Sequence, residues 1–254
     1  MEAKLFSASS PEYKDSCNSY FTAFNNKFSP SAVARPTSVN DVAQLVQQLS
    51  TSTSQVAVRG GGCTPWKGAA NIDGGITIDM RGINGVHLSD DDKIVSIGAG
   101  ADWGTVYKAI SSKGLGVAGG RVCRVGVTGL TLGGGFSFFT SRYGFVCDTV
   151  FNFEVVLASG EVVNANNTTN ADLFRALKGG GNNFGIVTQV DLQTFPQGDF
   201  WGGMTVHPPT ESAELLKALY DFATLQITDE YAHIMVSLGW ALAVGGDMWQ
   251  CGMQ

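Results

Sequence analysis

The residues in this sequence that are best suited to chemistry are runs of glycine that interrupt regular strand and helix patterns. They lie at 60–62, 119–120, 133–135 and 179–181, and no glycine occurs before Gly60. Glycine allows tight turns and lets a ligand approach the bare main chain closely. Each run alone is typical of an ordinary loop. Together, the runs predict several turns whose backbone amides converge on one ligand.

The composition is that of a folded, acidic chain. Of the 254 residues, 16 are Lys or Arg and 22 are Asp or Glu, which gives a net charge of −6 at pH 7. Nucleic-acid binding needs a basic face for the phosphates, so we expect no nucleic-acid partner. Hydrophobic residues make up 44% of the chain, which is ample for a core. No apolar run approaches the roughly 20 residues of a membrane span, so we expect no membrane partner.

Neither the cysteines nor the histidines form a metal or disulfide pattern. The five cysteines are widely spaced, with no Cys-x-x-Cys pair and an odd total: Cys17, Cys63, Cys123, Cys147 and Cys251. This spacing predicts no zinc site and no disulfide framework. The three histidines stand singly, without a carboxylate or cysteine at ligand or triad spacing: His87, His207 and His233. We therefore expect no metal and assign the histidines no role.

The first ten residues do not have the pattern of a secretory signal peptide. They carry Glu2 and Lys4 and lack an apolar stretch. The expected localisation is therefore intracellular by default, and secreted if the true amino terminus is missing from this sequence.

The hydrophobic pattern of the first half predicts a mixed arrangement of helices and strands. Ser38 and Asp41 make a capping box for a helix over 38–49. A second helix is expected over 103–112, with Gly114 just past its end. Short β-branched or apolar runs predict strands at 55–58, 76–80, 94–97 and 115–118.

The second half continues this pattern up to Pro196 and then changes. A hairpin, a helix capped by Asn170 and a strand are expected at 153–157 with 161–164, 171–177 and 186–194. Beyond Pro196, a strand, a helix and a strand are expected at 205–206, 211–225 and 233–238. The last stretch, 245–254, shows no strand pattern. The fold class that these elements predict is α+β.

Four segments in one order resemble a known family: Arg35-Pro36-Thr37-Ser38 with Asp41-Val42, then 58–66, 119–135 and 179–187. Together they resemble the PCMH-type FAD-binding domain of the vanillyl-alcohol-oxidase superfamily, in its fungal berberine-bridge-enzyme-like branch. The resemblance covers about residues 30 to 200. It implies a two-subdomain FAD-binding domain, followed by the beginning of an α/β substrate domain with an antiparallel sheet. We expect an N-terminal segment, the FAD-binding domain and an incomplete substrate domain at 1–30, 31–198 and 199–254.

The resemblance also implies FAD as the cofactor and names the residues that bind it. An acidic chain is no obstacle, because backbone N–H groups in glycine turns can bind the pyrophosphate of FAD without a basic side chain. The implied residues are Arg59, Gly60, Gly61, Gly62, Cys63 and Thr64 in a first loop, Gly119, Gly126, Val127, Thr128 and Gly129 in a second wall, and Gly185 and Val187 in a later strand.

Two departures from the family pattern concern the way in which the flavin is held. Cys63 stands where the family normally has a histidine that carries the flavin through its 8α-methyl carbon. The second family anchor, a cysteine three residues before the valine of Val-Gly-Val, would fall here on Val122 rather than on Cys123. On an extended segment, Cys123 would point away from the flavin. We therefore expect a noncovalent flavin, and a reactive Cys63 that links the flavin is the alternative.

The function that the resemblance implies is that of an FAD-linked oxidoreductase acting on a small organic substrate in fungal secondary metabolism. Family members are considerably longer, and we expect this chain to be C-terminally truncated. The catalytic base and the oligomeric state are unassigned. Two alternatives are a non-redox isomerase or cyclase on the same scaffold and a truncated, non-catalytic pseudoenzyme.

Overall fold

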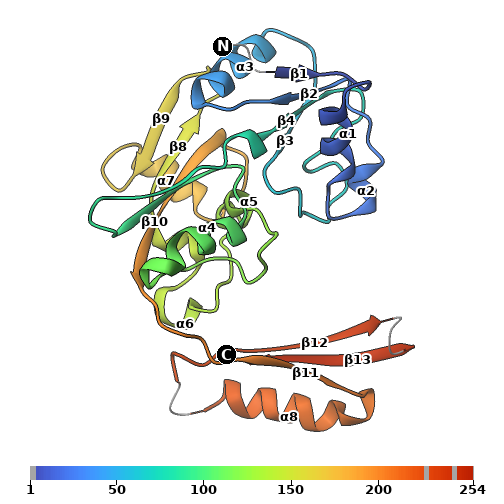
Figure 1. Ribbon diagram of the computed structural model, residues 1–254, viewed down its shortest axis with the longest axis vertical. Coiled ribbons are helices and arrows are strands. Elements are labelled where there is room, and N and C mark those ends of the chain that lie inside the picture. Colours follow the sequence, from blue (N-terminus) through green and yellow to red (C-terminus); the bar gives the residue numbers. More distant parts are fainter. Residues whose placement is uncertain (1–3, 226–228, 242–244, 254) are drawn as a thin grey trace. The chain divides into compact units, whose positions relative to one another are not determined.

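The computed structural model describes residues 4–225, 229–241 and 245–253, which form two compact units. The first unit comprises the described residues up to 137 together with 143–197 (Figure 1). The second comprises 138–142 and the described residues from 198 onward. The described part of the N-terminal segment expected at 1–30 lies within the first unit.

A four-stranded sheet and three helices open the first unit. Its strand order is β1 (Lys4–Phe6), β2 (Ala32–Arg35), β4 (Ile76–Asp79) and β3 (Val56–Arg59). The pair β1–β2 is antiparallel, and the other two pairs are parallel. The helices are α1 (Pro11–Asn18), α2 (Ala23–Asn26) and α3 (Val39–Ser50). The capping box predicted at the start of α3 is confirmed, because Ser38 and Asp41 each accept the other's backbone N–H.

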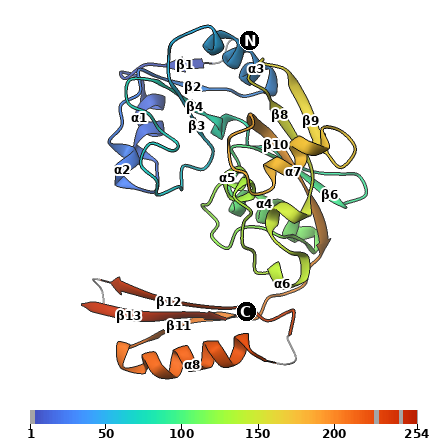
Figure 2. The same ribbon diagram turned by 180° about the vertical axis from the view of Figure 1, so that it is seen from behind.

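A six-stranded antiparallel sheet forms the rest of the first unit. Its order is β5 (Val86–Leu88), β6 (Ile94–Gly98), β10 (Ile186–Pro196), β8 (Val150–Val156) and β9 (Val162–Asn166), and β7 (Leu115–Val117) also pairs with β10. The remaining helices of the first unit are α4 (Trp103–Ile110), α5 (Val127–Leu132) and α7 (Ala171–Leu177), of which α7 contacts β9 (Figure 2). The short helix α6 (Thr140–Tyr143) belongs to the second unit except for its last residue. Short 3₁₀ turns are η1 (Met80–Gly82), η2 (Ser111–Lys113) and η3 (Val146–Thr149).

The two largest of three hydrophobic cores among the described residues hold these sheets together. The larger core surrounds the six-stranded sheet and includes the fully buried Trp103, Phe153 and Leu192. The smaller core lies between α3, the four-stranded sheet and the β8–β10 pair, and it includes Val42 and Val156. Because Val156 belongs to β8, this second core joins the two sheets of the first unit through direct packing. The third core packs Tyr13 and Cys17 of α1 against Val33 of β2.

The second unit is a three-stranded antiparallel sheet with one long helix. Its order is β11 (Gly203–His207), β13 (Gly246–Met253) and β12 (Ile234–Ala241), and the turn η4 (Pro209–Glu211) leads into α8 (Ser212–Ala223). The expectation that residues 245–254 lack a strand is therefore wrong for the described residues. Glycines and polar residues obscure the alternation, but Cys251 is buried and the Trp249 indole N–H donates to Ser212 Oγ at 2.7 Å.

Most other elements lie within one to three residues of the predicted ranges, and the α+β class is confirmed. Gly114, which follows the second predicted helix, has φ +68°. This left-handed conformation is common for the residue just past the end of a helix. Asn170 does precede α7, but its side chain does not cap it. It has φ +48°, and its Nδ2 donates to the Asn164 carbonyl at 2.8 Å. Within the described ranges, no helix has both the length and the apolar character needed to cross a membrane.

A buried carboxylate ties the N-terminal helix to the first sheet. Asp79, at the end of β4, is fully buried. It accepts hydrogen bonds from Arg81 at 2.7 Å, from Arg35 at 3.3 Å and from the Ser16 hydroxyl of α1 at 2.8 Å. Burial by itself would raise the pKa of Asp79, but the hydrogen bonds and charge of Arg81 and the charge of Arg59 hold it below its usual value.

Replacing Asp79 with asparagine tests this anchor. A buried cluster that loses its carboxylate leaves uncompensated arginines, so Asp79→Asn should lower the free energy of unfolding by about 3 to 5 kcal/mol. Since the folded-state pKa is lowered, the stabilisation is present above about pH 4 and is lost as the pH falls through the folded-state pKa. Urea unfolding between pH 3 and 7 measures both effects. An unchanged pH dependence in Asp79→Asn would show that another carboxylate controls acid unfolding.

Candidate functional site

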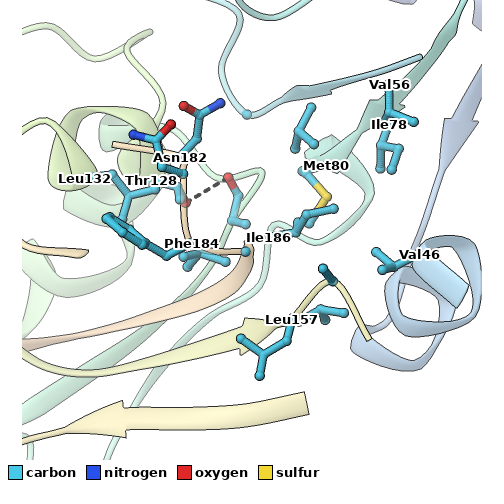
Figure 3. Close-up of a pocket in the computed structure, with 18 of the residues that line it drawn as sticks. Val46, Val56, Ile78, Met80, Thr128, Leu132, Leu157, Asn182, Phe184 and Ile186 are labelled. Carbon is cyan, nitrogen blue, oxygen red and sulfur yellow. Dashed lines mark hydrogen bonds between the residues drawn. The ribbon is translucent and has the colours of Figure 1, made fainter. Parts of the chain in front are cut away.

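A cavity of about 520 Å³ lies in the first unit, a volume typical of ligand sites. Its lining comes from α3, β3, β4, α5, the β8–β9 turn and residues 182–187 (Figure 3). Most of the lining side chains are aliphatic, among them Val46, Leu49, Val58, Ile78, Met80, Leu132, Val156 and Ile186. Among the described residues that line it, none is Lys, Arg, Asp or Glu. The cavity is therefore suited to an uncharged, flat or apolar group.

Five residues of the predicted cofactor set line this cavity: Gly60, Thr128, Gly129, Gly185 and Val187. The Thr128 hydroxyl donates to the Ala99 carbonyl at 3.1 Å, the bond that Figure 3 marks. Gly185 has φ +145°, and a Cβ there would lie 2.7 Å from Val155 Cγ1. Only glycine fits this position without strain.

The predicted first loop continues from the cavity wall as a turn with free amide groups. Gly62 has φ +69° and is buried. In the part of the chain that the structure describes, the backbone N–H groups of Gly61, Gly62 and Cys63 donate no hydrogen bond to a protein acceptor. Consecutive unpaired amides in a turn are a site for an anion. Because Gly60 also lines the cavity, the apolar space and the free amides are adjacent.

The two glycine-rich turns meet directly through their backbones. A Cβ on Gly61 would lie 2.5 Å from the Gly126 nitrogen, and a Cβ on Gly126 would lie 2.5 Å from the Gly61 nitrogen. Real Cβ contacts are essentially never this short. The turn after β3 and the turn before α5 can therefore touch only because both positions lack a side chain.

Three predicted residues lie away from the cavity lining, and a backbone group of each is hydrogen-bonded within the protein. Val127 is fully buried, and its amide donates to the Ala101 carbonyl at 3.0 Å. Gly119 donates its N–H to the Ser137 hydroxyl at 3.2 Å and lies against the Trp103 ring. The Thr64 carbonyl accepts from Asn25 at 3.2 Å. For these residues a direct cofactor contact stays a prediction.

The Arg59 side chain does not line the cavity. It is 1% exposed, and its Nη2 donates to the Ser19 carbonyl at 2.9 Å. Burial lowers the pKa of Arg59, against the raising effect of the Asp79 carboxylate. Any role of Arg59 in binding an anion at this loop is therefore indirect.

Cys63, at the first family anchor position, and Cys123, one residue away from the second, differ in their surroundings. The Cys63 thiol donates to the Arg124 carbonyl at 3.2 Å. Cys123 is exposed, and its carbonyl accepts from the Gly104 amide at 2.9 Å. The premise of an extended segment at Cys123 is wrong, because a 3.1 Å bond from the Val125 amide to the Val122 carbonyl closes a turn there. Alternation of side chains along a strand therefore says nothing about Cys123.

The expectation for His207 needs one correction. Its Nδ1 lies 2.7 Å from Glu211 Oε2, and its Nε2 lies 2.8 Å from the Thr205 hydroxyl. The spacing of residues in the sequence did not reveal these contacts, because the chain turns sharply between β11 and η4. The contacts join the end of the strand to the helix that follows. Across the described ranges, no group of three or more His, Cys, Asp or Glu side chains could hold a metal ion.

Several lining residues were not among the predicted site residues. Asn182, Asn183 and Phe184 line the cavity beside Gly185, and they directly follow a glycine run already singled out in the sequence. The sequence signal that could have identified these residues was the glycine run at 179–181, which lies between two elements of the site. The sequence pattern indicated only that Met80 and the α3 side chains are core residues, since the apolar wall of a cavity has the same pattern as a hydrophobic core.

These features fit FAD, which joins two aromatic ring systems through a pyrophosphate. The apolar cavity fits a ring system, and the unpaired amides of residues 61–63 fit the phosphates. A bare backbone at Gly61 and Gly126 brings both parts of the site together.

Comparison with known proteins agrees with this geometry. The family model described as FAD binding domain matches residues 30–166. FAD-dependent monooxygenase CTB5 of Cercospora beticola is 41% identical over 246 residues, which are 94% of this chain and 46% of that protein. This chain spans about half the length of the curated relatives that it matches.

Two solved structures share the fold. 6-Hydroxy-D-nicotine oxidase from Arthrobacter nicotinovorans has a TM-score of 0.87 and 28% identity, covering 100% of this chain and 55% of that one. A variant of berberine bridge enzyme in complex with (S)-reticuline has a TM-score of 0.83 and 21% identity, covering 99% and 52%. The second likeness shows the fold alone, and it confirms the predicted architecture.

Both the sequence motifs and the site geometry point to the same cofactor. The matched range contains both glycine turns that meet at Gly61 and Gly126. The family model covers more than half of the residues of this chain. The chain therefore belongs to the family of the FAD binding domain, and its cofactor is FAD.

Proposed function

We propose that this chain forms the cofactor-binding part of an FAD-linked oxidoreductase that acts on a small organic substrate. The observation that carries the proposal is the apolar cavity that begins at Gly60, directly before three unpaired backbone amides. The names of the relatives, a monooxygenase and an oxidase among them, favour redox chemistry over an isomerase or a pseudoenzyme.

The residues divide the work of holding FAD between backbone and apolar contacts. The amides of Gly61, Gly62 and Cys63 would bind the pyrophosphate. The aliphatic walls from α3, β3 and β10 would enclose a ring system and exclude water from it. When bound, FAD supplies the capacity to accept two electrons from a substrate. The protein part described here provides binding and orientation.

The flavin is held noncovalently in this proposal. Cys63 replaces the histidine of the family pattern, and its thiol already donates to the Arg124 carbonyl. This hydrogen bond would have to break before the sulfur could act as a nucleophile, and the nucleophilic form of cysteine is the thiolate. Noncovalent binding would then depend on the cavity and on the turn amides alone.

Acid precipitation of the purified, yellow chain tests this mode of binding. We expect the flavin to remain in the supernatant, because no covalent bond retains it. Cys63→Ala, which removes the thiol of the first loop, should release flavin to the same extent. Yellow colour in the wild-type pellet that disappears in Cys63→Ala would contradict noncovalent binding and identify Cys63 as the link.

A methyl group at the contact of the two turns tests the site itself. In Gly61→Ala, the new Cβ would lie 2.5 Å from the Gly126 nitrogen, so the turns must separate. We expect the Kd for FAD to rise at least tenfold, or about 1.4 kcal/mol, in a fluorescence titration of the apoprotein.

Gly133→Ala is the matched control for this experiment. Its Cβ would meet only backbone oxygens at 3.5 and 3.6 Å, which is ordinary contact, and its φ is −88°. FAD affinity should be unchanged in this variant. Equal affinity of Gly61→Ala and the wild type would show that the contact between the two turns does not contribute to binding.

A further inference from the structure

The N-terminal segment 16–21 lies directly beneath the turn that holds the unpaired amides. The Phe21 amide donates to the Gly62 carbonyl at 3.0 Å. A Cβ on Gly62 would lie 3.1 Å from Tyr20 Cδ1 and 2.9 Å from Arg59 Nε. The turn therefore rests on an arginine and a tyrosine, with no space between them and its backbone.

Arg59 connects this turn to the end of α1. One of its terminal nitrogens, Nη1, donates to the Ser16 carbonyl. The other, Nη2, donates to the Ser19 carbonyl at 2.9 Å and to the Ser19 hydroxyl at 3.1 Å. Carbonyls at the C-terminus of a helix lack partners within the helix, and a cation there is favourable. Arg59 thus binds α1 through two separate carbonyls.

Tyr20 holds the guanidinium from the other side. The Arg59 Cζ lies 4.0 Å from the centre of the Tyr20 ring, a cation–π distance. The Tyr20 hydroxyl donates to the Ala70 carbonyl at 2.9 Å, and the side chain is 5% exposed. The hydrogen bond to Ala70 therefore fixes the position of the ring. Ala70 lies at the far end of the loop that begins with the glycine turn.

The chemistry of the guanidinium explains why arginine occupies position 59. Its planar fork reaches two carbonyls at once and stacks on an aromatic ring, which a lysine ammonium does not reproduce. These contacts direct the side chain toward α1 rather than into the cavity. The matched family range begins at residue 30, so Ser16, Ser19 and Tyr20 lie outside it.

We infer that Arg59 and Tyr20 are positioning residues for FAD: they clamp the end of α1 to the glycine turn and so fix the amides of residues 61–63. The N-terminal segment is then a working part of the cofactor site. This inference rests on the proposed noncovalent binding of FAD by those amides. It predicts that weakening the clamp loosens the turn before FAD is added.

The experiment combines hydrogen exchange of the apoprotein with FAD titration, using the full chain. In Arg59→Lys, deuterium uptake should increase in the peptides that contain Phe21 and Gly62, and the Kd for FAD should rise about tenfold. Arg175→Lys is the matched control, since Arg175 is exposed on α7 and forms no hydrogen bond or ion pair with residues 16–21 or 60–63 in the described chain. Its uptake at those peptides and its FAD affinity should equal those of the wild type.

A second pair of variants serves if Arg59→Lys does not fold. Tyr20→Leu removes the ring beside the guanidinium and should raise uptake and Kd in the same direction. Tyr20→Phe keeps the ring and should restore most of the affinity. The clamp is refuted if uptake at Phe21 and Gly62 stays at the wild-type level in both Arg59→Lys and Tyr20→Leu, or if Arg175→Lys has the same effect as Arg59→Lys. If the wild type binds no FAD, the proposed function fails, while the exchange data still decide on the clamp.

Discussion

The first unit depends on a contact between two backbones, at Gly61 and Gly126. A Cβ on either residue would lie 2.5 Å from the other's nitrogen. This contact joins a turn of the four-stranded sheet to the turn before α5, which packs in the core of the six-stranded sheet. A side chain at either position would separate the two turns. The free amides would then move away from the cavity wall.

In the proposed site, main-chain donors take the place of the basic side chains that many anion sites use. The described lining of the cavity holds no charged residue, and Arg59 is directed to α1. This arrangement explains how a chain with a net charge of −6 can bind a dianionic cofactor group. It also makes the turn geometry more important, because amides are only useful when the backbone is held in one conformation.

Sequence patterns predicted the structure where a local rule determines it. The capping box at Ser38 and the left-handed Gly114 follow from chemistry within a few residues. Such patterns failed at β13, whose strand character depends on pairing with β11 and β12, and at the turn around Cys123. The glycine runs predicted turns that border the cavity, but the aliphatic walls did not stand out from the core. The side-chain direction of Arg59 depends on a partner about forty residues away, which no local pattern reveals.

The proposed site depends on one step, the binding of the FAD pyrophosphate by the amides of Gly61, Gly62 and Cys63. The most direct measurement is an NMR titration of the ¹⁵N-labelled apoprotein with FAD and with ADP, which shares the pyrophosphate but lacks the flavin. We expect the amide protons of these three residues to move strongly downfield with both ligands, because each gains a charged acceptor. Unchanged resonances at all three residues, with shifts elsewhere in the chain, would contradict this binding mode.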